Sequence, residues 1–402
     1  MINPSFIAIP ITSACNYRCK FCEVSGVSDM LKKRNRQYQK NSMSFESIQK
    51  FKPMIKTAQV VNLGGRTGPG EPLLAKNFED IVREIRNINS NVVIDLTTNG
   101  SLLTKERSEF LVSMSPVAVT FSIHASTPES YSDIMATSEK AFHRVVENII
   151  NFCQAAQGKQ VQVSFNFGFG KKNYQDIEDI ISFARKLGVH FVTVFPYYKS
   201  PNKFMEDVSL YDDIALANET IKKAYDHAAK IGQRLDPPEP NLLKDKEELS
   251  KKELEYSGGC QEPFTSFLLK GDMYSPGKAG FCVCNRIVLA HVDIDNFTSD
   301  DLYWAWYHPI VNMLRLPNPR DLPPICKFCK DPEISSIRSL DHEEYKKRRD
   351  RACKETLAMF QSEELRSSPS GAICLLEENI FSVDYQFSEI DSTPAGSTIL
   401  RR

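Results

Sequence analysis

Three cysteines near the start of the chain have the residue type and the spacing to bind an iron–sulfur cluster. Cys15, Cys19 and Cys22 form a C-x3-C-x2-C pattern directly after the apolar run Phe6–Ile11. Cysteine thiolates are the usual ligands of such clusters, and each iron of a [4Fe-4S] cube takes one outer ligand. Three thiolates on one loop would therefore leave one iron open. A structural zinc site normally has four ligands, and no further Cys or His lies nearby in the sequence.

A second group of cysteines lies in the C-terminal half of the chain. Cys260 is followed by Cys282 and Cys284, and later by the C-x2-C pair Cys326 and Cys329. Such a pair can be half of a zinc site, a redox pair or two ligands of a cluster. Because the cysteines cluster rather than disperse, they do not suggest the disulfide framework of a secreted protein. We expect a cytoplasmic location, where thiolates stay available to iron.

Length and composition limit the class of protein. The chain has 402 residues, 41% hydrophobic and 25% charged, with a net charge of −1. This length predicts two domains. The bulk charge gives no reason to expect nucleic acid or an anionic membrane as a partner. No segment approaches the ~20 apolar residues of a membrane helix, and no basic region precedes the first apolar stretch, so we expect no cleaved signal peptide.

Apolar, β-branched runs alternate with amphipathic stretches in the first half of the chain. This alternation predicts parallel β/α units with right-handed crossovers, an α/β fold. The six expected strands are Phe6–Ile11, Val60–Leu63, Val92–Leu96, Val117–Ile123, Val161–Phe167 and Phe191–Phe195. The expected helices include Ile81–Ile88, Lys105–Val112, Ala141–Gln154 and Tyr174–Leu187. Six units are too few for a closed eightfold barrel, and an active site would lie at the C-terminal ends of the strands.

The loop sequence CNYRCKFC, with Phe21 before the last cysteine, resembles the signature of the radical S-adenosylmethionine (radical SAM) enzymes. The resemblance implies that Cys15, Cys19 and Cys22 hold a [4Fe-4S] cluster whose open iron is chelated by S-adenosylmethionine. In that family an electron from the cluster cleaves the sulfonium to give methionine and a 5′-deoxyadenosyl radical, which abstracts a hydrogen atom from substrate. The family's core is a partial (βα)6 TIM-like barrel, and an external one-electron reductant of the flavodoxin or ferredoxin type is implied.

Glycines follow the second expected strand. Gly70 and Glu71 resemble the family's GGE segment, which binds the amino group of S-adenosylmethionine. Pro69 stands where the first Gly of that segment is usual, and a role for Arg66 stays open. Turns rich in Gly and Pro are also common at strand ends without any function.

Polar residues lie at the ends of the next strands. Thr98 and Asn99 belong to a segment that resembles the family's TNG turn, although Asn and Gly also suit a simple turn. Alternation along the fifth strand puts Ser164 and Asn166 on the face opposite its apolar residues, where they need polar partners, either S-adenosylmethionine or water. The residues that the resemblance places at S-adenosylmethionine are Phe21, Gly70, Glu71, Thr98, Asn99, Ser122, His124, Ser164, Asn166 and Val194.

His124 is the titratable group at these strand ends with the widest chemical range. It could move a proton to or from the substrate, or it could remain neutral and only donate or accept hydrogen bonds in the pocket.

The later cysteines resemble the SPASM/twitch extension of radical SAM enzymes. In that arrangement Cys260 opens a β-hairpin, Cys282 closes it after a Gly, and a helix with tryptophan, here near Trp304 and Trp306, leads to the final C-x2-C pair. A full SPASM domain binds two auxiliary clusters and needs a C-x2-C-x5-C-x3-C run, whereas Cys329 is followed only by Cys353 and Cys374, which do not have this spacing. The resemblance implies a twitch domain with one auxiliary [4Fe-4S] cluster on Cys260, Cys282, Cys326 and Cys329. Cys284 is an alternative to Cys282, and zinc is an alternative to the cluster.

A proline-rich segment that begins at Asp236 predicts a domain boundary. The expected units are a core barrel (1–235), a linker and helix (236–258), a small twitch/SPASM-like domain of a β-hairpin and a helix (259–345), and a C-terminal helix with an irregular tail (346–402).

Twitch enzymes with one auxiliary cluster include an aminocyclitol dehydrogenase. We therefore expect an oxidoreductase that oxidises a small polyol, amino sugar or related metabolite, with the auxiliary cluster accepting an electron. Modification of a peptide or protein is an alternative, as is epimerisation with Cys284 as the hydrogen-atom donor. A non-enzymatic iron–sulfur electron carrier would gain nothing from an open iron.

Overall fold

The alternation of apolar runs and amphipathic stretches produces alternating strands and helices in the first half of the chain. The computed structural model describes residues 3–22, 42–64, 70–197, 208–243, 266–270, 278–280, 290–291 and 297–307, together with 347–348, 351 and 355.

Neighbouring strands pair in parallel from β1 to β7. Their bounds are β1 Phe6–Ala8, β2 Val60–Asn62, β3 Val93–Thr98, β4 Val117–Ser122, β5 Val161–Phe169, β6 Phe191–Pro196 and β7 Leu235–Asp236. The six predicted strands are thus confirmed, and β7 is a short addition that the sequence pattern did not indicate. Strand β1 ends earlier than predicted because Pro10 has no N–H for the ladder, although Ile9 and Ile11 still donate to the backbone of the neighbouring strand segment.

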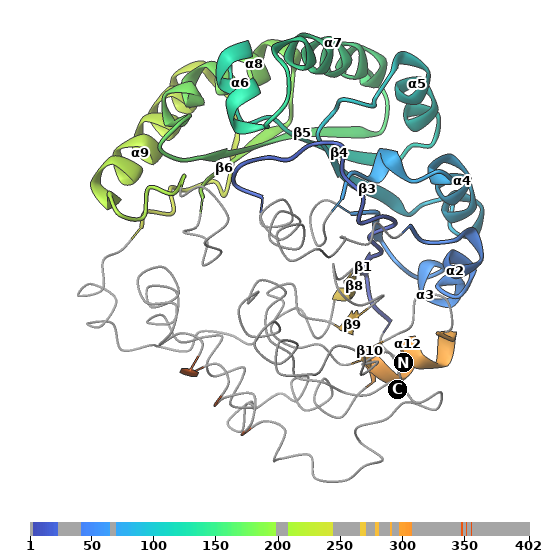
Figure 1. Ribbon diagram of the computed structural model, residues 1–402. Coiled ribbons are helices and arrows are strands. Elements are labelled where there is room, and N and C mark those ends of the chain that lie inside the picture. Colours follow the sequence, from blue (N-terminus) through green and yellow to red (C-terminus); the bar gives the residue numbers. More distant parts are fainter. Residues whose placement is uncertain are drawn as a thin grey trace, which may run out of the picture.

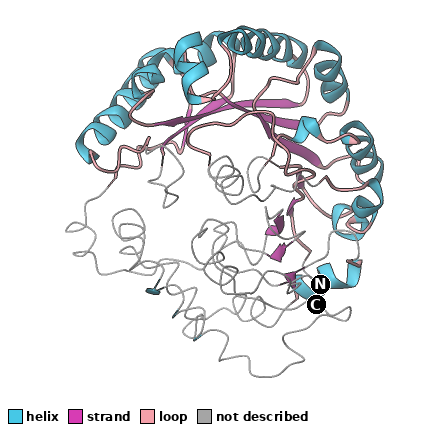
Figure 2. Cartoon of the chain, viewed as in Figure 1, coloured by secondary structure: helices cyan, strands magenta, loops and turns pink. Residues whose placement is uncertain are grey.

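Helices lie along the outer side of this curved sheet. Their bounds are α2 Phe45–Gln49, α3 Lys52–Ile55, α4 Phe78–Ile88, α5 Lys105–Ser113, α6 Pro128–Ile134, α7 Glu139–Ala156, α8 Ile177–Leu187, α9 Ile214–Ile231 and α12 Ser299–Trp306, with the 3-10 helices η1 Pro72–Leu74 and η2 Tyr174–Asp176. Figure 1 shows α4 to α9 as an outer arc, and Figure 2 shows the strands inside it. The α/β prediction of a partial, TIM-like barrel is therefore confirmed.

The two faces of the sheet differ in polarity. On β4 the side chains of Val117, Val119 and Phe121 are at most 1% exposed and belong to the core. The alternate residues of this strand, among them Thr120 and Ser122, are only half-buried. Because alternate residues of a strand point to opposite faces, the helices cover an apolar face, and polar side chains line the inner face.

The first strand of a hairpin extends this sheet at the β1 edge. Strand β8 (Ser266–Lys270) pairs in parallel with β1, and β9 (Lys278–Gly280) pairs antiparallel with β8. Strand β10 (Ala290–His291) pairs antiparallel with β9. Helix α12 starts at a capping box formed by Thr298 and Asp301.

Helix α12 packs its buried Trp306 edge-on against Phe267 of β8, with ring centroids 6.4 Å apart. A hairpin and a tryptophan-bearing helix are thus present, whereas all five cysteines predicted for this region (Cys260, Cys282, Cys284, Cys326 and Cys329) lie outside the described residues, as does Arg66. Within the described part of the chain, the helices are too short or too polar to cross a membrane.

Candidate functional site

The cysteine loop follows β1 at the C-terminal edge of the sheet. Cys15, Cys19 and Cys22 are each half-buried. Burial raises the pKa of Cys15 to about 11 and the pKa of Cys19 well above its ordinary value, and the charge of Cys22 adds to both shifts. This mutual effect indicates that the three thiols lie near one another. At neutral pH the thiols of Cys15 and Cys19 are protonated without metal, so binding a metal or cluster must displace their protons.

The donors fit an iron–sulfur cluster. All three are sulfur ligands carried by one short loop, and a cube takes each thiolate at a different iron. In the part of the chain that the structure describes, no three Cys, His, Asp or Glu side chains form a group for a single metal ion. The three thiols therefore suit a cluster, in which each thiolate binds a different iron, so the sulfur atoms need not surround a single metal ion.

Gly70 brings the loop after β2 against the start of the cysteine loop. Its φ is +109°, and a Cβ at this position would lie 2.2 Å from the carbonyl oxygen of Thr12. The next residue, Glu71, donates its backbone N–H to the carbonyl oxygen of Ala14 at 2.7 Å. Only glycine suits this combination of backbone conformation and close approach.

The Glu71 carboxylate connects this segment to the end of β3. Its Oε1 accepts hydrogen bonds from Thr98 Oγ1 at 2.7 Å and from the Leu73 N–H at 3.2 Å, and its Oε2 accepts from the Asn99 N–H at 2.7 Å. Burial raises the pKa of Glu71, and these hydrogen bonds and the Arg107 charge oppose the rise. The structure thus brings together three predicted cofactor residues, Glu71, Thr98 and Asn99.

A ring of three polar side chains ties the same turn to the cysteine loop. Asn99 Nδ2 donates to Asn16 Oδ1 at 2.9 Å, and Asn16 Nδ2 donates to Ser101 Oγ at 2.8 Å. Ser101 Oγ closes the ring by donating to Asn99 Oδ1 at 2.6 Å. Sequence reasoning missed Asn16 and Ser101, although the position of Asn16 beside Cys15 could have drawn attention to it. The ring fixes the backbone between the first two cysteines.

Aromatic rings surround the last part of the cysteine loop. Phe21 stacks on Tyr197, with ring centroids 4.3 Å apart and an interplanar angle of 10°, and meets His124 edge-on at 4.6 Å. A Cβ on Gly168 would lie 2.2 Å from the Tyr197 ring. The Tyr197 ring can therefore take its position only because residue 168 is a glycine. Neither Tyr197 nor Gly168 was among the predicted site residues, because their roles depend on the contact between β5, β6 and the loop.

His124 is neutral in this environment. Burial lowers its pKa to about 3. Its Nδ1 accepts a hydrogen bond from the Gly168 N–H at 2.9 Å, which leaves the proton of the neutral ring on Nε2. Asn173, also unpredicted, donates from Nδ2 to the backbone oxygens of His124 and Gly168. These surroundings favour a hydrogen-bonding role over proton transfer to or from the substrate.

Other predicted cofactor residues line the inner face of the sheet. Ser122 of β4 is in register with Asn166 of β5, and both are half-buried. Ser164 is buried, and its Oγ lies 2.8 Å from Thr120 Oγ1, so a protein side chain supplies a partner that we had expected from cofactor or water. Val194 of β6 is half-buried, but it is in register with Phe167, so its side chain lies on the opposite, apolar face of the sheet. Contacts of these residues with S-adenosylmethionine stay predictions.

These features define a class of protein, a parallel α/β partial barrel with a three-thiol loop after its first strand. The family model of the Radical SAM superfamily matches residues 9–184. This segment contains the cysteine loop and strands β2 to β5, and the match supports the radical SAM superfamily for this part of the chain. The family implies a [4Fe-4S] cluster and S-adenosylmethionine.

Curated relatives match about half of the chain. A probable GTP 3′,8-cyclase of Saccharolobus islandicus (strain L.S.2.15 / Lassen #1) is 28% identical over 220 residues, which is 54% of this chain and 64% of that protein. The GTP 3′,8-cyclase of Aquifex aeolicus is 30% identical over 183 residues, which is 46% of this chain and 53% of that protein. The matches thus span less than two thirds of these relatives.

Solved structures support the fold over a longer part of the chain. Streptococcus suis SuiB bound to S-adenosylmethionine aligns with a TM-score of 0.55 at 17% identity, covering 82% of this chain and 76% of that chain. Native anSMEcpe with bound AdoMet aligns with a TM-score of 0.51 at 14% identity, covering 88% and 97%. At these identities the similarity shows the fold alone.

Proposed function

We propose that this chain is a radical SAM enzyme that acts on a small metabolite, with a [4Fe-4S] cluster on Cys15, Cys19 and Cys22. The observation that carries the proposal is the placement of these three thiols on one loop at the C-terminal edge of a parallel barrel sheet. When bound, the cluster and S-adenosylmethionine supply one-electron cleavage chemistry and a hydrogen-abstracting radical. An external one-electron reductant of the flavodoxin or ferredoxin type completes the scheme.

The residues of the chain hold and surround this chemistry. The Asn16, Asn99 and Ser101 ring fixes the first half of the cysteine loop, and the Glu71 carboxylate keeps the turn after β3 against it. Phe21 and Tyr197 form an apolar wall beside the cysteine loop. Next to that wall, the neutral ring of His124 carries its proton on Nε2, where it can donate a hydrogen bond without adding charge.

The inner face of the sheet fits a polar cofactor and substrate. The hydroxyls of Thr120 and Ser122 and the amide of Asn166 lie there on adjacent parallel strands. Such groups hydrogen-bond a hydroxyl-rich or amine-bearing molecule with little charge. This face supports a small polar metabolite as the substrate.

Oxidation of a polyol, amino sugar or related metabolite is the reaction we propose, with an auxiliary [4Fe-4S] cluster accepting the second electron. Its support is the sequence pattern of Cys260, Cys282, Cys326 and Cys329 and the hairpin and helix between them. Cys284 is an alternative ligand to Cys282.

Cyclisation of a purine nucleotide is the second candidate. The curated relatives at 28–30% identity are named GTP 3′,8-cyclases. Their named substrate is a small molecule, which also favours a metabolite over a peptide. Peptide modification has support only from fold similarity, for example to SuiB bound to its precursor peptide SuiA, at 13% identity.

Anaerobic reconstitution of the full chain tests the proposal. We expect about eight irons per chain if both clusters form, and 5′-deoxyadenosine when reductant and S-adenosylmethionine are added. Cys19→Ser should lose 5′-deoxyadenosine formation. Cys153→Ser is the matched control, because Cys153 is a buried thiol of α7 outside the site.

Two outcomes would contradict or refine the proposal. Wild-type protein that binds iron but never cleaves S-adenosylmethionine, with or without candidate substrates, would contradict radical chemistry. Product analysis with GTP and with a panel of polyols and amino sugars separates the two candidates: cyclised nucleotide supports the second, and a ketone or aldehyde product supports the first.

A further inference from the structure

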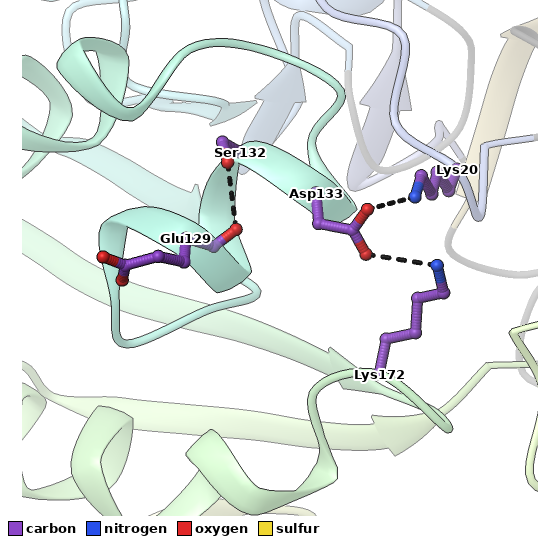
Figure 3. Close-up of polar contacts among 5 residues, drawn as sticks. All are labelled: Lys20, Glu129, Ser132, Asp133 and Lys172. Atoms are coloured by element: carbon purple, nitrogen blue, oxygen red, sulfur yellow. Dashed lines mark hydrogen bonds and ion pairs between the residues drawn. The ribbon is translucent and has the colours of Figure 1, made fainter.

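Helix α6 contacts the part of the cysteine loop that follows the Asn16 ring in the sequence. The Lys20 N–H donates to the carbonyl oxygen of Ile134 at 2.9 Å, and Cys19 Sγ lies 3.7 Å from Met135 Sδ. The Lys20 ammonium pairs with the Asp133 carboxylate. All three contacts fall on the segment around Cys19 and Lys20, so the C-terminal end of α6 fixes the second half of the loop, as Figure 3 shows for the ion pair.

Asp133 has a second cationic partner. Its Oδ2 lies 3.2 Å from Lys172 Nζ, and Lys172 follows β5 at the same edge of the sheet. Figure 3 shows the two lysines reaching one carboxylate from different segments of the chain. The Lys20 hydrogen bond, assisted by Lys172, lowers the pKa of Asp133. Asp133 is therefore ionised at neutral pH, and one negative charge faces two positive charges.

Helix α6 is firmly held at its other end. Thr127 caps the helix by accepting from the Ser130 N–H, and Asp176 of η2 accepts from Ser130 Oγ at 2.6 Å and from the Ser126 N–H at 3.1 Å. The fully buried ring of Tyr131 packs against Phe142 of α7, with centroids 5.4 Å apart, as well as against Tyr17 of the cysteine loop at 6.4 Å. Because the helix is anchored independently, it can position the loop rather than follow it.

Folding stability does not explain why two lysines meet one carboxylate here. The side chains of Lys20, Asp133 and Lys172 are 26%, 44% and 33% exposed, and exposed ion pairs add little to folding stability. Charges close to an iron–sulfur cluster, in contrast, act on its reduction potential. A negative charge disfavours the added electron, and a positive charge favours it.

We propose that Asp133 is a positioning residue for the cluster on Cys15, Cys19 and Cys22. It anchors Lys20 between the second and third cysteines, and its charge balances Lys20 and Lys172 so that the reduction potential of the cluster stays low. This inference rests on the proposed function, because it requires a cluster at the three cysteines.

The test uses the full chain, reconstituted anaerobically. The measurements follow one cluster, which is identified because its electron paramagnetic resonance (EPR) signal changes when S-adenosylmethionine is added. Asp133→Asn removes the charge and keeps the shape. Glu129→Gln is the matched control, because it makes the same change on the same helix, and the Glu129 carboxylate is exposed and points away from Asp133 and both lysines (Figure 3).

We expect Asp133→Asn to raise the midpoint potential of this cluster, more at low than at high ionic strength, and to shorten severalfold the half-life of its iron against a chelator. Lys172→Met should shift the potential the opposite way, and Asp133→Glu should restore the wild-type value. A merely structural role would change iron retention without shifts of opposite sign.

Two results separate the inference from the function on which it rests. If Asp133→Asn and Glu129→Gln have the same potential and the same iron half-life, the inference is overturned while the function stands. If the wild-type chain forms no cluster that responds to S-adenosylmethionine, the proposed function itself fails, and the inference fails with it.

Discussion

Replacing Gly70 with alanine is expected to displace the start of the cysteine loop. The new Cβ would lie 2.2 Å from the carbonyl oxygen of Thr12 and 3.1 Å from that of Ala14. Both atoms belong to the backbone, so no side-chain rotation can relieve the contact. The loop before Cys15 must move, or the segment that carries Glu71 must withdraw from it.

Gly158 provides a matched comparison for the size of this effect. Its φ is +70°, also in the region that favours glycine, and a methyl group added there would have no atom within 4 Å. Alanine costs about 1–2 kcal/mol at Gly158, whose φ is close to the left-handed helical region, and at least as much at Gly70, whose φ of +109° lies outside it. Only at Gly70 does overpacking add about 1–3 kcal/mol. We therefore expect Gly70→Ala to be less stable than Gly158→Ala by about 2 kcal/mol.

Urea unfolding of the metal-free chain, followed by circular dichroism under reducing conditions, measures this difference. Iron per chain after reconstitution measures its effect on the loop. Gly70→Ala should retain less iron than wild type, and Gly158→Ala should retain the same amount. Equal stability and equal iron in the two variants would refute the idea that the Gly70 contact supports the cysteine loop.

Three further predictions concern the groups around the loop. Glu71→Gln replaces one accepting oxygen with an NH2 group, which would face a buried donor such as the Asn99 N–H. We expect this change to lower the free energy of unfolding, measured in urea, by about 1–3 kcal/mol. Burial lowers the pKa of His124 from 6.5 to about 3. The contribution of this histidine to folding stability is therefore fully present above about pH 6.5 and is lost as the pH falls towards 3. In NMR, the resonances of its ring should show the neutral form down to about pH 4. Gly168→Ala should displace the Tyr197 ring from Phe21 and change the near-ultraviolet circular dichroism.

Each of these predictions has a control. Glu79→Gln changes a half-exposed carboxylate of α4 and should leave the stability within error of wild type, so an equal effect at Glu71 would contradict its buried network. His124→Gln should flatten the pH dependence between pH 3 and 6.5, and an unchanged slope would contradict the pKa shift. Gly158→Ala should leave the aromatic signal unchanged; the same spectrum for Gly168→Ala would disprove the contact.

Local pattern was enough to predict the sheet. β-branched runs, their alternation and their spacing indicated six parallel strands, and the inward position of Ser164 and Asn166 followed from the two-residue period of β5. The pattern did not indicate β7, which is two residues long, or the parallel pairing of β8 with β1, because such pairing joins segments far apart in the sequence. Helix α6 was also missed, since seven residues give little periodicity.

The candidate site was predictable only where residue type alone carries chemistry. The thiols of Cys15, Cys19 and Cys22 were found from their spacing, and Gly70 from its resemblance to the GGE segment of radical SAM enzymes. Asn16 and Asp133 were missed because their importance depends on partners that only the folded chain brings near. Asn16 meets Asn99 across 83 positions, and Asp133 meets Lys20 across 113.

The central claim is that the three-thiol loop holds a cluster with one iron open for S-adenosylmethionine. The most direct measurement is electron–nuclear double resonance of the reduced, reconstituted chain with S-adenosylmethionine labelled at its amino nitrogen and carboxylate oxygen. Coupling of both labels to the cluster is predicted for wild type, with none in Cys19→Ser. A wild-type cluster whose signal shows no coupling to either label would contradict the account.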